Sequence, residues 1–235
     1  MHKISVDDIT IHVKRKDIKH IYLSLQPPYG RVRISAPKGM DDEAVRSFAV
    51  SKLSWIKRHR ARFKKQKRRS PQEYISGEGH YFKGKRYVLN VIYQSPPLPN
   101  QVRIRSEKYL DLYVRKGSHK EQRKRVLKEW YREQLKEMIP DLIEKWESKI
   151  GVKVNEWSVK LMKTKWGSCN ITDKRVWVNL ELAKRRPLCL EYILAHELVH
   201  FLEPHHNHRF AAYMDQFLPD WKSLNEELNR FSLGQ

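Results

Sequence analysis

The sequence His196-Glu197-Leu198-Val199-His200 lies within the apolar run that extends from Leu188 to Phe201. Pro187 suits the first turn of a helix and Pro204 ends one, so we predict a buried helix here. Residues four positions apart lie on the same side of a helix, about one turn from each other. We therefore expect both imidazoles to reach a single metal ion, with Glu197 beside it.

A third ligand is expected from the segment after Pro204. The spacing favours His206, because it gives His-Glu-x-x-His, five residues, then His, the interval of metzincin-type proteases, although Glu203 stands where those enzymes have glycine. His205 and His208 compete for the same role, and we interpret each as a solvent-facing or supporting group. Glu203 itself is the alternative ligand, as in gluzincin-type sites, but it lies too close along the helix.

A larger set of motifs surrounds this stretch and resembles the YgjP-like metallopeptidase family. The resemblance extends from the amino-terminal half to the end of the chain, and its one visible departure is His205-His206-Asn207 where many relatives have Asn-His-Ser. The site is more distantly similar to the SprT and WLM zinc proteases, some of which act on proteins attached to DNA. The matching segments are residues 31–39, 55–56, 84–87, 165–169, 176–180, 196–200, His206 with Phe210, and 218–221.

The resemblance implies that His196, His200 and His206 bind Zn²⁺ and that Glu197 is the general base. Three neutral imidazoles leave a fourth position of zinc for water, and an adjacent carboxylate can take the proton of that water. These residue types at this spacing are typical of metal-assisted peptide hydrolysis. The expected substrate is therefore a protein or a peptide.

The expected substrate contacts come from the strand that precedes the helix. In zinc proteases of this plan, a substrate often lies along an edge strand, and we assign that role to the predicted strand from Val176 to Leu180. Its candidate contact residues are Asn179, Val178 and Trp166. Three residues, Tyr213, Arg209 and Lys165, are candidates for stabilising the oxyanion, and the sequence does not choose between them.

The composition favours a cytoplasmic protein with its own core. The first residues carry acids where a signal peptide needs an apolar block, and no apolar stretch is long enough to span a bilayer. Cys169 and Cys189 are too few for a disulfide framework, which agrees with a reducing compartment. Cys169 is also a candidate zinc ligand, but we interpret it as a small packed residue.

The net charge of +21 is concentrated at the amino-terminal end. Residues 1–70 carry 19 Lys and Arg against 6 acids, a net charge of +13, whereas residues 71–118 and 119–235 each carry +4. An acid-free basic run within this end suits phosphate backbones, although it could also be a solvated helix end. Its candidate nucleic-acid contacts are Lys57, Arg58, Arg60, Arg62, Lys64, Lys65, Lys67, Arg68 and Arg69.

The pattern of elements predicts an α+β protein with two domains. An antiparallel, β-rich domain with one helix, residues 1–117, is expected to precede a mostly helical zincin-like domain with a small sheet, residues 118–235. Predicted strands cover residues 9–13, 18–25, 31–35, 81–93, 102–114, 157–162 and 176–180. A helix of about 30 residues from Ser118 is expected to kink or divide at Pro140.

Two other classes of protein remain open at this stage. A metal-dependent nuclease would agree with the charge, but such sites usually hold magnesium with carboxylates rather than imidazoles. A noncatalytic nucleic-acid-binding protein with structural zinc would need a closed shell of four ligands. Replacement of Glu197 separates these classes from a peptidase, because only a peptidase needs it for cleavage.

Overall fold

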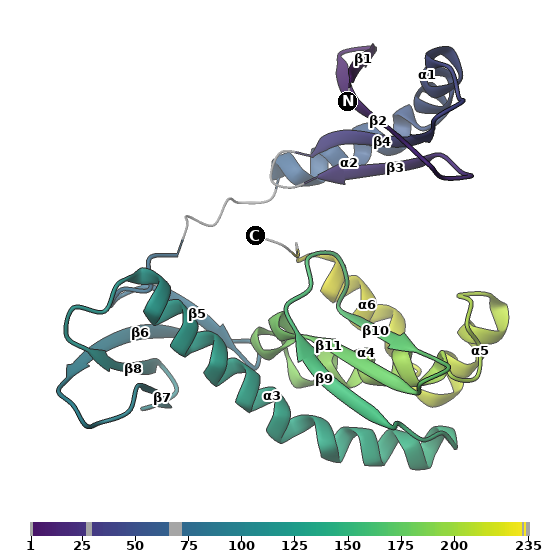
Figure 1. Cartoon of the computed structure of the whole chain (residues 1–235). Helices are drawn as coiled ribbons and strands as arrows, with labels where there is room; N and C mark the ends of the chain where they lie inside the picture. The colour runs from purple at the N-terminus through teal and green to yellow at the C-terminus, as the bar shows by residue number, and fades with distance from the viewer. Residues whose placement is uncertain (1, 27–29, 66–71, 232, 234–235) are drawn as a thin grey trace. The chain divides into compact units, whose positions relative to one another are not determined.

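The computed structural model describes residues 2–26, 30–65, 72–231 and 233, with the backbone alone for 62–65. The chain forms two compact units, residues 1–70 and 71–234 (Figure 1). The boundary expected after residue 117 therefore falls inside the second unit. The reason is a shared core, since Leu110 and Leu112 of the sheet and Leu127 and Leu135 of the following helix belong to one buried cluster.

The first unit consists of a four-stranded sheet and two helices. The alternation of apolar and polar residues in its strands buries one face of the sheet, where Ile11 and Ile34 are fully buried. The helices cover this face through Val45, Ala49 and Ile56. The elements are β1 (His2–Val6), β2 (Ile9–Lys16), β3 (Tyr22–Gln26), β4 (Arg31–Pro37), α1 (Asp42–Ser51) and α2 (Leu53–Lys65).

The sheet of the first unit is mixed and not the antiparallel meander that we expected. Its strand order is β1-β2-β4-β3, and β2 pairs with β4 in parallel, with Ile11 opposite Val32. The chain carries β3 to the far edge, so β4 returns between β2 and β3. This change keeps the predicted apolar positions on the buried face, because Leu23 and Leu25 of β3 pair with Ile34 and Val32.

The second unit starts with a sheet of the same topology. Its strand order is β5-β6-β8-β7, and β6 pairs with β8 in parallel as β2 pairs with β4. The expected strand over residues 81–93 is in fact a hairpin, and Gly84 with φ of 81° lies in its tight turn. The strands are β5 (Gly79–Phe82), β6 (Lys85–Gln94), β7 (Gln101–Ile104) and β8 (Tyr109–Arg115).

Helix α3 (Lys120–Ile150) is continuous through Pro140 and is not divided there. It buries one side along its whole length, from Leu127 to Ile150, and ends at Gly151 in the left-handed conformation. This burial supplies the stabilisation that offsets the hydrogen bond lost at the proline. In the part of the chain that the structure describes, no helix is both long and apolar enough to cross a membrane.

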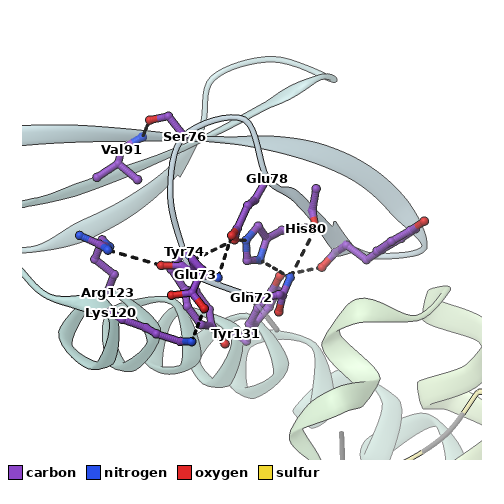
Figure 2. Close-up of polar contacts among 12 residues, drawn as sticks. Gln72, Glu73, Tyr74, Ser76, Glu78, His80, Val91, Lys120, Arg123 and Tyr131 are labelled. Atoms are coloured by element: carbon purple, nitrogen blue, oxygen red, sulfur yellow. Dashed lines mark hydrogen bonds and ion pairs between the residues drawn. The ribbon is translucent and has the colours of Figure 1, made fainter. Parts of the chain in front are cut away.

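A segment of polar residues fastens the start of the second unit to α3 and β6 (Figure 2). The Glu78 carboxylate accepts hydrogen bonds from the backbone N–H groups of Glu73, at 2.7 Å, and Tyr74, at 2.8 Å. The Glu73 carboxylate pairs with Lys120 of α3 at 2.6 Å. His80 lies buried beneath this segment, 3.4 Å from the Glu78 carboxylate, and burial lowers its pKa.

The remaining elements form a small sheet and four helical segments after α3. The strand order of the sheet is β10-β11-β9, so β11 is its central strand. This part of the chain contains the predicted metal site. The elements are β9 (Glu156–Lys160), β10 (Gly167–Asn170), β11 (Arg175–Asn179), the 3-10 helix η1 (Leu180–Lys184), α4 (Pro187–Val199), α5 (His208–Phe217) and α6 (Trp221–Asn229).

Candidate metal centre

Helix α4 carries the first two histidines as predicted. Pro187 occupies its first turn, and apolar side chains such as Leu194 and Leu198 bury the helix among the neighbouring elements. His200 follows directly as the C-cap residue, with helical backbone angles. His196 and His200 are therefore one turn apart on the same side, with ring centroids 4.9 Å from each other.

The connection between α4 and α5 brings a third imidazole to these two. Nε2 of His206 lies 3.0 Å from Nε2 of His196 and 3.1 Å from Nε2 of His200. Asn207 then starts α5, because its side chain accepts hydrogen bonds from the N–H groups of Arg209 and Phe210. The three Nε2 atoms form the one such group of possible metal ligands found among the described residues.

These separations suit a small tetrahedral cation. Ligand nitrogens about 2.0–2.1 Å from zinc in tetrahedral geometry lie about 3.3 Å from each other, close to the separations found here. Three neutral nitrogen donors are also the donor set that zinc accepts in catalytic sites, whereas magnesium and calcium prefer oxygen. The residues present therefore fit zinc in charge, donor type and spacing.

A backbone carbonyl selects the tautomer of His200. Nδ1 of His200 lies 3.1 Å from the carbonyl oxygen of Glu203, and a carbonyl can only accept a hydrogen bond. Nδ1 therefore carries the proton, and Nε2 offers its lone pair to the centre of the cluster. Nδ1 of His196 is buried and has no hydrogen-bond partner among the described residues.

The alternative ligands lie outside the cluster. The Glu203 carboxylate is engaged within its own loop, where it accepts a hydrogen bond from the N–H of His205 at 3.3 Å and pairs with Arg209 at 3.7 Å. His205 and His208 are exposed and do not join the three converging nitrogens. The spacing argument for His206 therefore agrees with the geometry.

Phe210 is a member of the site to which sequence reasoning gave no role. Its ring is 98% buried and contacts all three imidazoles, with centroid distances of 4.9 Å to His196, 4.7 Å to His200 and 4.8 Å to His206. The ring packs the histidines into a fixed arrangement on one side of the cluster. Its signal was its place in the family motif, four residues after His206.

The surroundings keep His196 and His200 neutral. Burial, together with the charges of the neighbouring His200 and His206, lowers the pKa of His196 to about 3. Burial also lowers the pKa of His200, although the Glu203 carbonyl opposes this effect. Because a metal binds only the neutral imidazole, the site is prepared for metal near neutral pH.

The carboxyl group of Glu197 is buried, and its surroundings bring its pKa into a range that suits proton transfer near neutral pH. Burial raises its pKa to about 7, while a hydrogen bond from the Cys169 thiol and the charge of Lys165 lower it. A base with a pKa near the working pH both accepts and releases a proton readily. Cys169 lies beside this carboxylate and is not among the converging metal-ligand atoms, in agreement with its interpretation as a packed residue.

The expected substrate contacts on β11 are wrong in their placement. Strand β11 pairs with β10 on one side and β9 on the other, so it has no free edge for a peptide. Asn179 and Val178 are fully buried. The Asn179 side chain instead bonds the backbone of the loop before β10, donating to the carbonyls of Met162 and Lys165 at 2.9 and 2.6 Å.

Strand β10 is an edge strand of its sheet, and it packs against helix α4. Trp166 lies half-buried at its start, with Arg185 over its ring, and its carbonyl accepts a hydrogen bond from the N–H of Asn179. In an antiparallel pair such bonded residues alternate with residues whose backbone groups point away. The backbone N–H and C=O groups of Gly167 and Cys169 therefore point toward the free edge.

The three oxyanion candidates differ in their surroundings. Lys165 lies near enough to Glu197 to affect its pKa. Arg209 is paired with Glu203, and Tyr213 stacks on Phe217 with an interplanar angle of 10°. None of the three is selected by these contacts.

The basic run is described only in part. Lys57 and Arg58 are exposed and Arg60 is half-buried on α2, where Lys57 pairs with Asp7 at 2.5 Å. Arg62, Lys64 and Lys65 continue the helix, but their side chains are not described. Lys67, Arg68 and Arg69 lie outside the described residues.

Most of the chain matches the model of one protein family. Residues 20–231 match the model described as "YgjP-like, metallopeptidase domain". The chain belongs to the YgjP-like metallopeptidase family. Membership makes it a peptidase, whose substrates are proteins or peptides, and implies a divalent metal at the histidine cluster of this YgjP-like protein.

The solved structures similar to this chain include two archaeal zymogens. The metallopeptidase zymogen abylysin of Pyrococcus abyssi is 16% identical, with a TM-score of 0.36, and the match covers 39% of this chain and 92% of that one. The metallopeptidase zymogen jannalysin of Methanocaldococcus jannaschii is 21% identical, with a TM-score of 0.34, over 39% of this chain and 94% of that one. A search of curated proteins gave no match.

Proposed function

We propose that this YgjP-like protein is a zinc-dependent peptidase in which His196, His200 and His206 hold the metal and Glu197 is the general base. The convergence of the three Nε2 atoms at 3.0 and 3.1 Å carries this proposal. It is supported by the lowered pKa values of His196 and His200 and by the raised pKa of Glu197, about 7.

The reaction assigns one task to the metal and the rest to the protein. When bound, zinc supplies Lewis-acid chemistry, which acidifies a water molecule and polarises the peptide carbonyl. Glu197 accepts a proton from that water while the water oxygen forms a bond to the carbonyl carbon of the peptide. Glu197 then gives the proton to the amide nitrogen as the carbon–nitrogen bond breaks, which yields one carboxyl and one amino product.

The substrate is proposed to lie along β10 in an extended conformation. The outward backbone groups of Gly167 and Cys169 would hydrogen-bond the peptide backbone as an added strand does. Because these contacts involve the main chain, they hold a peptide without regard to its side chains. The position of β10 beside Glu197 would place the scissile bond near the base.

Replacement of Glu197 by Gln tests the proposal directly. We expect the purified variant to retain the zinc content of the wild type, since all three imidazoles remain, and to lose cleavage of an unfolded protein by about a hundredfold or more. Glu191→Gln is the matched control on the same helix, because Glu191 pairs with Lys145 and is not among the converging ligand residues. Undiminished cleavage by the Glu197 variant would refute its role as base.

The same assay separates the other two classes of function. A nuclease would degrade nucleic acid and spare the unfolded protein, and a structural zinc site would show neither activity.

The amino-terminal charge favours substrates associated with nucleic acid, so we expect added DNA to stimulate cleavage of a DNA-bound protein more than of a free one. Equal rates for the two substrates would argue against this preference.

A further inference from the structure

The sheet of the first unit has one face that its own helices do not cover. Helices α1 and α2 pack on the face that carries Ile11 and Ile34 (Figure 1). We call the opposite side of the sheet the open face. Its residues, fixed by the alternation and register of the four strands, are Lys3, Ser5, Thr10, His12, Lys14, Lys16, Tyr22, Ser24, Gln26, Arg31, Arg33, Ser35 and Pro37.

The open face carries cations and no acid among these residues. The register places Lys3, His12 and Arg33 side by side on three adjacent strands, with Arg31 two residues from Arg33 on the same strand. None of its five Lys and Arg side chains belongs to an ion pair within the described part of the chain. Neighbouring strands are about 4.8 Å apart, so this positive charge is dense.

The helix-covered side of the same unit differs in this respect. Arg15 pairs with Asp42, and Lys57 pairs with Asp7, so several cations there have a partner. The sheet of the second unit, which has the same topology, also differs, because Asp111 on its corresponding face pairs with Arg105. The five cations of the open face thus form no ion pair with a described residue, whereas Arg15, Lys57 and Arg105 each have an acidic partner.

Two polar atoms at the centre of the open face have no hydrogen-bond partner among the described residues. Nδ1 of His12 and Nε of Arg33 are buried and make no hydrogen bond to any described residue. Partial burial lowers the pKa of His12, and the charges of Arg31 and Lys3 lower it further, which reflects the positive potential at this position. An anion above His12 would satisfy this potential.

We propose that the open face binds single-stranded nucleic acid. Phosphate groups complement the unpaired cations, and Tyr22, 57% exposed at the edge strand β3, offers a ring on which a base can stack. A sheet face with cations, hydroxyls and an exposed aromatic ring suits an extended strand with accessible bases, whereas it has no helix to enter a duplex groove. The inference does not depend on peptidase activity.

Two fourfold variants of the full chain test this assignment. The open-face variant changes Lys3, Lys14, Arg31 and Arg33 to Gln, and the control variant changes Lys19, Lys38, Arg46 and Lys52, which lie outside both the open face and the basic run, to Gln. Both variants remove four charges from the same unit, so a general effect of net charge would weaken the nucleic-acid binding of both equally. Binding is measured by fluorescence anisotropy on an oligothymidylate of about twenty nucleotides at several salt concentrations.

We expect the open-face variant to bind at least about tenfold more weakly than wild type, and its salt slope to fall by up to about 3, at about 0.7 for each lost phosphate contact. The control variant should lose less than about threefold in affinity. Tyr22→Ala should weaken binding, and Tyr22→Phe should preserve it, because stacking needs only the ring. Circular dichroism confirms folding; if the fourfold variant unfolds, the double variant Lys14→Gln with Arg31→Gln carries the same comparison.

Several outcomes would overturn the proposal. Equal losses in the two fourfold variants would mean that net charge alone drives binding. Tighter binding to a duplex of the same length would exclude the single-stranded mode. Binding of phosphatidylserine vesicles without binding of the oligonucleotide would assign the face to a membrane surface. Because no cleavage is measured, these results are independent of the Glu197 experiment.

Discussion

Gly167 passes so close to Glu197 that no side chain fits between them: a Cβ at residue 167 would lie 2.6 Å from Oε1 of Glu197. The same Cβ would lie 2.6 Å from Cγ2 of Ile193. Helix α4 and strand β10 therefore approach each other closely where Glu197 faces the edge strand. In the proposed mechanism, this close approach would bring a peptide on β10 within reach of the Glu197 carboxylate.

Gly167→Ala is expected to reduce cleavage by about tenfold or more while the zinc content stays unchanged. The added methyl group must displace the Glu197 carboxylate or move β10, and a shift of about 1 Å in a reacting group costs much of the rate. Steady-state kinetics on a peptide substrate, with zinc measured on the same sample, checks this. Ser168→Ala is the control on the next residue of β10, and wild-type activity in Gly167→Ala would contradict the close approach.

Phe210→Ala is expected to lower both stability and zinc affinity. Removal of a buried phenylalanine costs about 3–5 kcal/mol of unfolding free energy, and here the cavity would open beside three ligand rings. Denaturant unfolding measures the first effect, and competition with a chelator measures the second. Phe210→Leu should recover part of the stability. If the alanine variant loses stability but binds zinc as tightly as wild type, the ring does not position the imidazoles.

Asn179→Ala is expected to act on stability rather than on substrate binding. Its buried amide bonds the carbonyls of Met162 and Lys165, and their loss leaves buried polar groups without partners, at a cost of at least about 2 kcal/mol. The exposed Asn229 serves as a control, and its replacement by alanine should cost less than about 0.5 kcal/mol. An unchanged unfolding free energy with a raised KM would instead restore the substrate role.

The buried His80 should make stability depend on pH. Burial lowers its folded pKa below 6.5, the charge of Lys184 acts in the same direction, and the opposing hydrogen bond and charge of Glu78 do not reverse it. The unfolded chain therefore binds more protons, so this stabilisation is present above pH 6.5 and is lost as the pH falls toward the folded pKa. Between pH 7.5 and 5.5, the melting temperature of wild type should fall more than that of His80→Gln; parallel curves would refute the prediction.

The convergence of the three histidines could be predicted because its determinants are local. The helical spacing of His196 and His200 fixes their common face, and Pro204 with Asn207 turns the chain so that His206 returns. The substrate strand could not be chosen in this way, because whether β11 or β10 is the edge depends on pairing between distant segments. Sequence alone also left β10 unassigned, because its four residues, Gly-Ser-Cys-Asn, include glycine and asparagine, which have low β-strand propensity.

The fold class was predicted correctly as α+β, but the boundary between units was not. Lys116-Gly117-Ser118 ends β8 with a turn, which is a local signal, yet the shared core of β8 and α3 joins the two sides of that turn. The parallel pairing of β2 with β4 was missed for a related reason. A run of predicted strands with short connections favours a meander, and only the positions of distant strands reveal the crossover.

The carbonyl of Glu203 that orients His200 belongs to the main chain, so no replacement of the side chain at 203 deletes it. Mutational scanning would then report position 203 through its loop contacts alone, and tolerance there would say nothing about the tautomer of His200. A thioamide, in which sulfur replaces the carbonyl oxygen of Glu203, would weaken this acceptor without altering any side chain. In this peptidase, chemical synthesis of the backbone can therefore test a part of the centre that genetics leaves untouched.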